Sequence, residues 1–290
     1  MLKIKKTFLI LTTLIAIGVI IAFFVFDGKN ILTTENLPYL KNNELIEVPS
    51  DGIFSILANP DDWILVDGKT IPIKVTFGLK SEFEDVYKQI GVYELENKPL
   101  IIVPIFTASA YEKNGFYNFF KNNCNQNCLT TEIISKDKLD YHSSANAVKV
   151  LELLGYDSIS DIELDKNSDI LLSYNSVIIL HNEYVTKKMF DAITSHPNVV
   201  FLYPNSLYAE ISVNYEDNTI SLIKGHGYPE SSIINGFDWE FENTHPYEFD
   251  TKCNDWDFYT ITNGVMLNCY PEQKIWNDEL LLKKLKEITS

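Results

Sequence analysis

The stretch SVIILHNEYVTKKMFDAITSHPNVVFLYP, residues 176–204, decides the fold that we expect. Residues 177–180 and 199–202 are short, continuous apolar runs rich in β-branched side chains, which is typical of strands covered on both faces. Between them, Thr186 is the expected N-cap of a helix that should end at His196, just before a proline. This order predicts two parallel strands joined by a right-handed helical crossover.

The composition indicates a globular chain with an acidic surface. The 290 residues are 46% hydrophobic, which is enough for one large core or two smaller ones. All 24 basic residues are lysine, and the net charge is -16. Bidentate phosphate recognition depends on arginine, so we expect no binding to nucleic acid. An acidic surface keeps a protein soluble and attracts cations.

An apolar run near the N-terminus predicts a membrane anchor. Residues 8–26 carry no charge and no proline, and they follow Lys3, Lys5 and Lys6. About 20 apolar residues span the hydrocarbon core, and flanking lysines stay in the cytoplasm. We therefore expect a single-pass protein of the cell membrane with a cytoplasmic N-terminus and an extracytoplasmic main domain. A cleaved signal peptide and a buried soluble helix are the alternatives.

The chain is expected to have three parts. Residues 1–27 hold the cytoplasmic lysines and the transmembrane anchor. Residues 28–60 are polar and interrupted by prolines, which is typical of a linker. Residues 61–290 should form one extracytoplasmic α/β domain.

The rest of that domain shows both strand and helix periodicities. Further strands are expected at 71–77, 100–106 and 157–164, and helices at 81–90, 143–156 and 277–288. After residue 204 the pattern changes to β-rich additions, with a hairpin of residues 209–213 and 219–223 and more β-structure over 236–270. The expected fold class is α/β, with a central parallel sheet and flanking helices.

The succession LLGYDSISDIELDK (residues 153–166) and DILLSYNSVIILHNEYVTKKMFDAITSHPNVVFLYP (residues 169–204) resembles the flavodoxin-like core of the class I glutamine amidotransferase-like superfamily. The chain is also similar to an uncharacterised group of predicted membrane-anchored proteins from ammonia-oxidising archaea. That second similarity rests on VPIFTASAYEKNGFYNFF, on NGFDWEFENTHPYEFD and on the two cysteine pairs. The first resemblance implies the fold, and the second brings no known activity.

The superfamily resemblance implies where a nucleophile would lie. Its members carry a catalytic cysteine in a glycine-flanked elbow after a central strand, and the equivalent turn here follows Leu202. That turn holds neither cysteine nor glycine, so Ser206 is the candidate nucleophile, with His226 or His181 as its base. The alternative is that Asn205 and Ser206 are ordinary turn residues.

Ligands of parallel sheets bind outside the carboxyl ends of the strands. Three segments qualify by position, at residues 107–111, 181–184 and 205–208. The expected ligand-binding residues are His181, Asn182, Glu183 and Asn205. The alternative is that His181 bonds a neighbouring backbone group and Glu183 is solvated.

An acidic stretch near the C-terminus is a candidate metal site. Residues 237–242 alternate with period two, which places Asp238, Glu240 and Glu242 on one face, with His245 nearby. A divalent cation such as calcium, or a transition metal bound through the histidine, would relieve their repulsion. A solvated outer face is the alternative, and no other cofactor is expected.

The four cysteines are expected to form disulfide bonds. Cys124 and Cys128 lie close together, as do Cys253 and Cys269, so two local bridges are the simplest pairing outside the cytoplasm. A four-cysteine zinc site is the alternative, although the spacing of zinc knuckles is absent.

These patterns predict a non-catalytic binding or structural module of the cell envelope. Its partner would be an envelope protein or a small-molecule or glycan ligand. The alternative is an amidotransferase-like or metal-assisted hydrolase of amide or glycan substrates, and a third possibility is a subunit of a larger membrane complex. A catalytic protein should bring His181 or His226 together with acids in one cleft.

Overall fold

The structure, a computed structural model, describes residues 45–66, 69–239, 253, 255–267 and 269–290. The chain divides into two compact units, of which the first comprises the residues up to 51 and 55–76, and the second 52–54 and 77–290. Among the described residues, no helix is long and apolar enough to cross a membrane. The predicted anchor at 8–26 lies outside the described residues.

The first unit contains two antiparallel strand pairs. Strand β1 (Ile46–Val48) pairs with β2 (Phe54–Ala58), and β3 (Trp63–Val66) pairs with β4 (Lys69–Pro72). The range 28–60, in which we expected a linker, thus contains β1 and β2. The single strand predicted over 71–77 is wrong, because β4 ends at Pro72, which has no N–H to continue a ladder, and β5 (Thr76–Leu79) begins after a bend.

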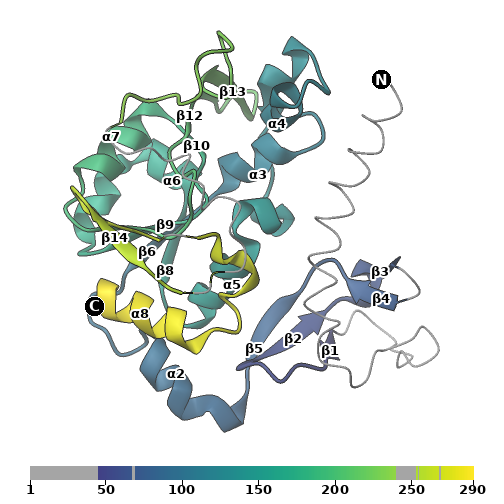
Figure 1. Cartoon of the computed structure of the whole chain (residues 1–290), viewed down its shortest axis with the longest axis vertical. Coiled ribbons are helices and arrows are strands. Elements are labelled where there is room, and N and C mark those ends of the chain that lie inside the picture. Colours follow the sequence, from purple (N-terminus) through teal and green to yellow (C-terminus); the bar gives the residue numbers. More distant parts are fainter. Residues whose placement is uncertain (1–44, 67–68, 240–252, 254, 268) are drawn as a thin grey trace. The chain divides into compact units, whose positions relative to one another are not determined.

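A six-stranded sheet forms the centre of the second unit (Figure 1). In spatial order it consists of β14 (Phe258–Ile261), β15 (Gly264–Leu267), β11 (Val199–Phe201), β9 (Val177–Ile179), β6 (Leu100–Val103) and β8 (Asp157–Ser160). All neighbours pair in parallel except β14 with β15, so the predicted parallel sheet is confirmed. From β8 to β15, the five parallel strands follow the chain order second, first, third, fourth, fifth.

Helices cover both faces of this sheet. Figure 1 shows α6 (Asp161–Lys166) and α7 (Lys187–Ser195) on one side, and α5 (Ala145–Leu153) and α8 (Glu279–Thr289) on the other. The remaining described α-helices are α2 (Glu84–Ile90), α3 (Ile105–Tyr111) and α4 (Phe116–Phe120). Short 3-10 helices lie at η2 (Pro60–Asp62), η3 (Ser81–Phe83), η4 (Gln126–Leu129), η5 (Lys136–Lys138), η6 (Tyr141–Ser143), η7 (Ser168–Ser173) and η9 (Pro271–Gln273).

The strand, helix and strand predicted at residues 176–204 are confirmed as β9, α7 and β11. Thr186 Oγ1 accepts a hydrogen bond from the backbone N–H of Met189 at 3.3 Å, which caps α7. Met189 and Ile193 are fully buried under the helix. The helix ends at His196 as predicted.

Several elements begin or end elsewhere than predicted. Strand β6 stops at Val103 because Pro104 leads directly into α3, so the expected loop at 107–111 is helical. Strand β8 ends when Ser160 and Glu163 form a capping box that starts α6. Helix α5 starts at Ala145 rather than 143, and its N-cap residue Ser144 is left-handed (φ 55°) and makes no side-chain cap.

The β-rich additions divide between two sheets: β14 and β15 extend the central sheet, and β12 (Ala209–Asn214) and β13 (Thr219–Lys224) belong to a second sheet of four strands. Its strands, in spatial order, are β10 (Tyr184–Val185), β12, β13 and β7 (Thr130–Glu132). The predicted hairpin is confirmed as β12 and β13. Residues 237–239 do not form the expected strand, although Phe237 still stacks on Phe190 and Trp239 packs on Phe201.

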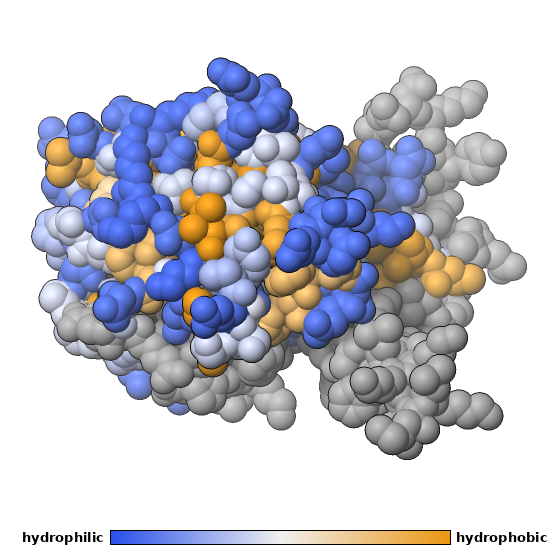
Figure 2. Space-filling view, turned by 90° about the horizontal axis from the view of Figure 1, so that it is seen from above, coloured by the Kyte–Doolittle hydropathy of each residue, from blue (hydrophilic) through white to orange (hydrophobic). Residues whose placement is uncertain are grey.

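Both predicted disulfide bonds are present. Cys124 is bonded to Cys128, with 6.1 Å between their Cα atoms, and Cys253 to Cys269, with 5.5 Å. The bridges close one loop beside α4 and one around β14 and β15. Seen from above, the surface is largely hydrophilic around a smaller apolar area near its middle (Figure 2).

Candidate functional site

The candidate site lies at the carboxyl ends of β6, β9 and β11 in the second unit. Strand order reverses between β6 and β9, because the chain continues from β6 to β8 on one side and from β9 to β11 on the other. A parallel sheet opens a crevice at such a reversal, and ligands bind there. Residues 181–183 leave β9 at this point.

Backbone hydrogen bonds fix the segment that carries Glu183. Its N–H donates to Thr107 Oγ1 on α3 at 2.9 Å, and its carbonyl accepts from the N–H groups of Tyr208 and Ala209 at 2.8 and 2.9 Å. Asn182 Oδ1 accepts from the N–H of Leu180 at 3.1 Å. These hydrogen bonds hold the backbone of Glu183 in place between the end of β9 and the start of β10.

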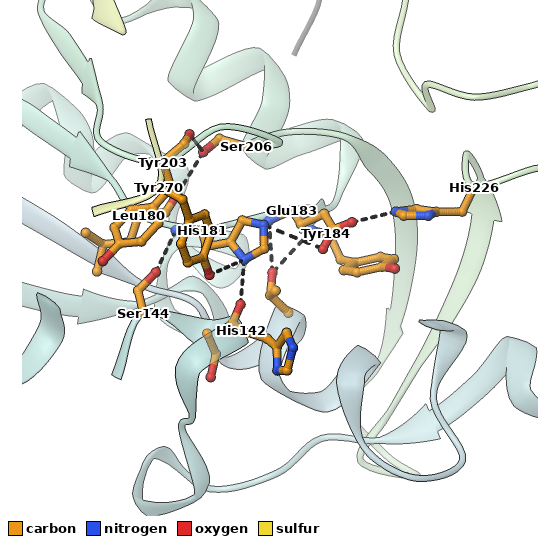
Figure 3. Close-up of polar contacts among 12 residues, drawn as sticks. His142, Ser144, Leu180, His181, Glu183, Tyr184, Tyr203, Ser206, His226 and Tyr270 are labelled. Carbon is orange, nitrogen blue, oxygen red and sulfur yellow. Dashed lines mark hydrogen bonds and ion pairs between the residues drawn. The ribbon is translucent and has the colours of Figure 1, made fainter. Parts of the chain in front are cut away.

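The carboxylate of Glu183 is hydrogen-bonded to His226 inside the protein (Figure 3). Its carboxylate is 0% exposed, and Oε1 accepts a hydrogen bond of 2.5 Å from Nε2 of His226, which is 5% exposed. Burial favours a higher pKa for Glu183, but His226 and the Tyr111 hydroxyl hold the pKa below its ordinary value. The carboxylate is therefore ionised at neutral pH.

His181 faces the same carboxylate from the other side. Its Nδ1 lies 2.5 Å from the carbonyl oxygen of His142, and because a carbonyl only accepts, Nδ1 must carry the proton. Burial lowers the pKa of His181, so the ring is neutral and its Nε2 presents a lone pair. Nε2 lies 3.8 Å from Oε2 of Glu183. We call His181, Glu183 and His226 the His–Glu–His cluster.

Buried polar atoms without a hydrogen-bond partner gather around this cluster. Half of all such side-chain atoms among the described residues belong to three neighbouring loops: His181 Nε2, Asn182 Nδ2, Glu183 Oε2, Tyr184 Oη, Asn205 Oδ1 and His226 Nδ1. An unpaired buried polar atom costs about 1–3 kcal/mol, so natural proteins retain few of them. Their concentration at one edge of the sheet points to a binding site.

Aromatic side chains from α3 and α4 cover the cluster. Tyr111 stacks on Tyr117 and on the ring of His142, with 4.5 and 4.8 Å between centroids. Phe120 meets His226 edge to face at 4.8 Å and is 47% exposed. We call Tyr111, Tyr117, Phe120 and His142 the aromatic layer. It separates the cluster from solvent.

Ser206 and His226, the suggested nucleophile and base, are not paired with each other. The hydroxyl of Ser206 lies 2.8 Å from the carbonyl oxygens of both Leu180 and Tyr203, either of which can accept its one proton, while His226 Nε2 contacts Glu183. Figure 3 shows Ser206 and His226 on opposite sides of Glu183. Asn205 adopts a left-handed conformation (φ 60°), which asparagine tolerates, and is buried at the same edge.

Two buried carboxyl groups near the sheet were not predicted. Glu272 caps the N-terminus of α5, where Oε1 accepts from the N–H of Asn146 at 2.6 Å, and the Tyr203 hydroxyl donates to Oε2 at 2.5 Å. Asp161 Oδ2 accepts from the N–H of Phe106 at 2.8 Å at the start of α3. Burial raises the pKa of both carboxyls. Each carboxylate accepts hydrogen bonds from a helix that is distant in sequence, so the local sequence pattern does not predict its burial.

Three of the four suggested metal ligands lie outside the described residues. Asp238 is exposed, and Glu240, Glu242 and His245 lie outside the described residues. Among the residues that the structure describes, no group of three or more His, Cys, Asp or Glu side chains could hold a metal ion.

No protein-family model and no curated protein matches the chain.

Proposed function

We propose that this chain is a membrane-anchored protein whose extracytoplasmic α/β domain binds a small ligand at the His–Glu–His cluster without catalysing a reaction. The observation that carries the proposal is the concentration of unpaired, buried polar atoms at the carboxyl edge of the sheet. Such atoms cost stability in the free protein, and a ligand that pairs with them recovers that cost.

The anchor and the location are supported by sequence and by the cysteines. Residues 8–26 are long enough to cross a bilayer, and lysines precede them. Both disulfide bonds lie in the part of the chain that would be outside, where disulfides persist.

The strand order also supports a flavodoxin-like core of the amidotransferase-like type. Five parallel strands in the order second, first, third, fourth, fifth are one of the two common doubly wound arrangements. Binding without catalysis is supported by the turn after β11, where the Ser206 hydroxyl faces two backbone carbonyl oxygens, which accept its proton in place of a base. A nucleophile of that superfamily would need a base at this hydroxyl.

A hydrolase is the second candidate, because both His181 and His226 converge on Glu183. In that case a water molecule between His181 Nε2 and Glu183 Oε2 would be the nucleophile. One of these two acceptors would take its proton as the general base. Hydrolysis of amide or glycosidic model substrates by the wild-type protein, abolished in Glu183→Gln, would favour this candidate.

A ligand screen tests the binding proposal. The full chain in mild detergent is heated with small amines, amino acids, carboxylates and sugars, beside Glu183→Gln and the control Glu216→Gln in the exposed β12–β13 turn. At a ligand concentration of 100 times Kd, binding stabilises the protein by about 2.7 kcal/mol, which raises Tm measurably. We expect a shift in the wild type and in the control that is lost in Glu183→Gln. Equal shifts in all three proteins would place the ligand elsewhere, and no shift with any ligand would refute the site.

A further inference from the structure

The His–Glu–His cluster holds two hydrogen-bond acceptors that face each other without a donor between them. Nε2 of His181 presents a lone pair because Nδ1 carries the proton toward His142. Glu183 uses Oε1 for His226, and Oε2 has no partner within hydrogen-bond distance among the described residues. The Tyr111 hydroxyl also interacts with this carboxylate, but a carboxylate oxygen accepts more than one hydrogen bond.

The separation of these acceptors suits one atom that donates two hydrogen bonds. Bonds of about 2.8 Å from a single atom to acceptors 3.8 Å apart enclose an angle of about 85°. The N–H bonds of an ammonium group diverge by somewhat more, and ordinary bending of a hydrogen bond covers the difference. A group with only one N–H or O–H would leave one acceptor unpaired.

The surroundings favour a positive charge on that donor. One acceptor is an ionised carboxylate, so hydrogen bonds from a cation are charge-assisted. Tyr111 and Tyr184, with 6.4 Å between their ring centroids, flank the cluster, and their stacking on Tyr117, His142 and His226 keeps water away from the carboxylate, which strengthens its interaction with a cation. The net charge of -16 also raises the local concentration of cations.

We propose that the His–Glu–His cluster binds a primary ammonium group, held between His181 Nε2 and Glu183 Oε2 beside the rings of Tyr111 and Tyr184. The proposal rests on the proposed binding function and names the class of its ligand. His226 acts as a positioning residue, because its bond to Oε1 turns Oε2 toward His181.

The ligand reaches the cluster through the aromatic layer. Helix α4 (Phe116–Phe120) is only five residues long, and Phe120, which is 47% exposed, lies over His226. Displacement of this short helix would be a local opening. A small ammonium ion therefore gains access without unfolding of the sheet.

The test uses methylammonium as the probe. Carbon-13-labelled methylammonium is titrated into the full chain in mild detergent at pH 7.5, and binding is followed by the relaxation of its methyl signal. The comparison proteins are Glu183→Gln and the control Glu216→Gln, which loses the same charge from an exposed turn. Glutamine at 183 removes the charge and offers its own N–H to His181, so we expect the affinity to fall at least about tenfold. The control should bind like the wild type.

Further measurements distinguish binding through N–H groups at the buried cluster from binding of cations at the acidic surface. Ammonium ion should compete with methylammonium, whereas tetramethylammonium, which has no N–H, should not. Raising the salt from about 0.15 to 1 M weakens a surface site strongly but a buried pair much less, so affinity in the wild type should change by less than about threefold. This last measurement needs no variant, and it decides the question if Glu183→Gln does not fold.

Three outcomes would overturn the proposal: equal affinity in Glu183→Gln, competition by tetramethylammonium, or a steep loss of affinity with salt. Absence of methylammonium binding would do so as well, and would indicate that water alone bridges the acceptors. If a neutral or anionic ligand from the screen still depends on Glu183, the binding function stands and only the ammonium class fails.

Discussion

The pH dependence of stability should report on Glu272, the buried carboxyl that caps α5. This side chain is 0% exposed, and burial raises its pKa from the ordinary 4.5 to about 8. Between these two pH values the folded protein keeps a proton that the unfolded chain releases. The stabilisation that comes from protonated Glu272 is therefore complete below pH 4.5. It decreases as the pH rises above 4.5, and it is lost once the pH has risen through 8.

The size of this effect follows from the two pKa values. Each pKa unit corresponds to about 1.4 kcal/mol, and partial ionisation at both ends of the range reduces the total. Between pH 5 and pH 9, Glu272 should lower the free energy of unfolding by about 4 kcal/mol. That is a large part of the stability of an ordinary domain.

The assay compares the wild type with Glu272→Gln. Glutamine has the shape of a protonated glutamate and cannot ionise, and its oxygen still accepts from the N–H of Asn146. Urea unfolding at pH 5, 6, 7, 8 and 9 gives the free energy of unfolding of each protein. The wild type should lose about 4 kcal/mol relative to the variant over this range, because all other titrating groups cancel in the difference.

A constant difference between the two proteins from pH 5 to pH 9 would refute this reasoning. It would mean that the donors around Glu272, namely two backbone N–H groups and the Tyr203 hydroxyl, hold the carboxylate ionised despite its burial. Carbon-13 NMR of the glutamate carboxyls would then show Glu272 titrating near or below pH 4.5.

Three further predictions concern the fold and the anchor. Under oxidising conditions, Cys253→Ser should lower the free energy of unfolding by about 3 kcal/mol and Cys124→Ser by about 2 kcal/mol, since the larger loop restricts the unfolded chain more; equal urea midpoints for both variants would contradict this. Gly264→Ala should cost about 3 kcal/mol in the same assay, because a Cβ there would lie 1.8 Å from the carbonyl oxygen of Val199; unchanged stability would show that β15 does not pair with β11. Deletion of residues 8–26 should release the protein from membranes washed at alkaline pH, and retention in the pellet would rule out the anchor.

The sequence predicts the centre of the fold because its patterns are local. The apolar runs of β9 and β11 and the cap at Thr186 specify strand, helix and strand within thirty residues of each other. The start of α3 is different. The apolar residues after Val103 continue the pattern of β6, and only Pro104 marks the change, while the group that accepts from the first turn of α3 is Asp161, far along the chain.

In the candidate site, too, some residues could be predicted from the sequence and others could not. The expectation that His181, Asn182 and Glu183 leave a buried strand follows from topology alone, and the structure places all three at the carboxyl edge. The pairing of His226 with Glu183 could not be predicted, because it requires the β12–β13 hairpin to return beside β10. The aromatic side chain of Tyr111 joins the site only because α3 follows β6 directly.

The most direct test of the account is the protonation of the histidine rings in the free protein. Nitrogen-15 NMR at pH 7.5 distinguishes a ring nitrogen that carries a proton from one that presents a lone pair. We predict that His181 is protonated at Nδ1 alone and that its Nε2 signal moves when ligand binds. A proton on Nε2 would turn this nitrogen into a donor toward Glu183, and it would contradict both the binding site and the ammonium class of its ligand.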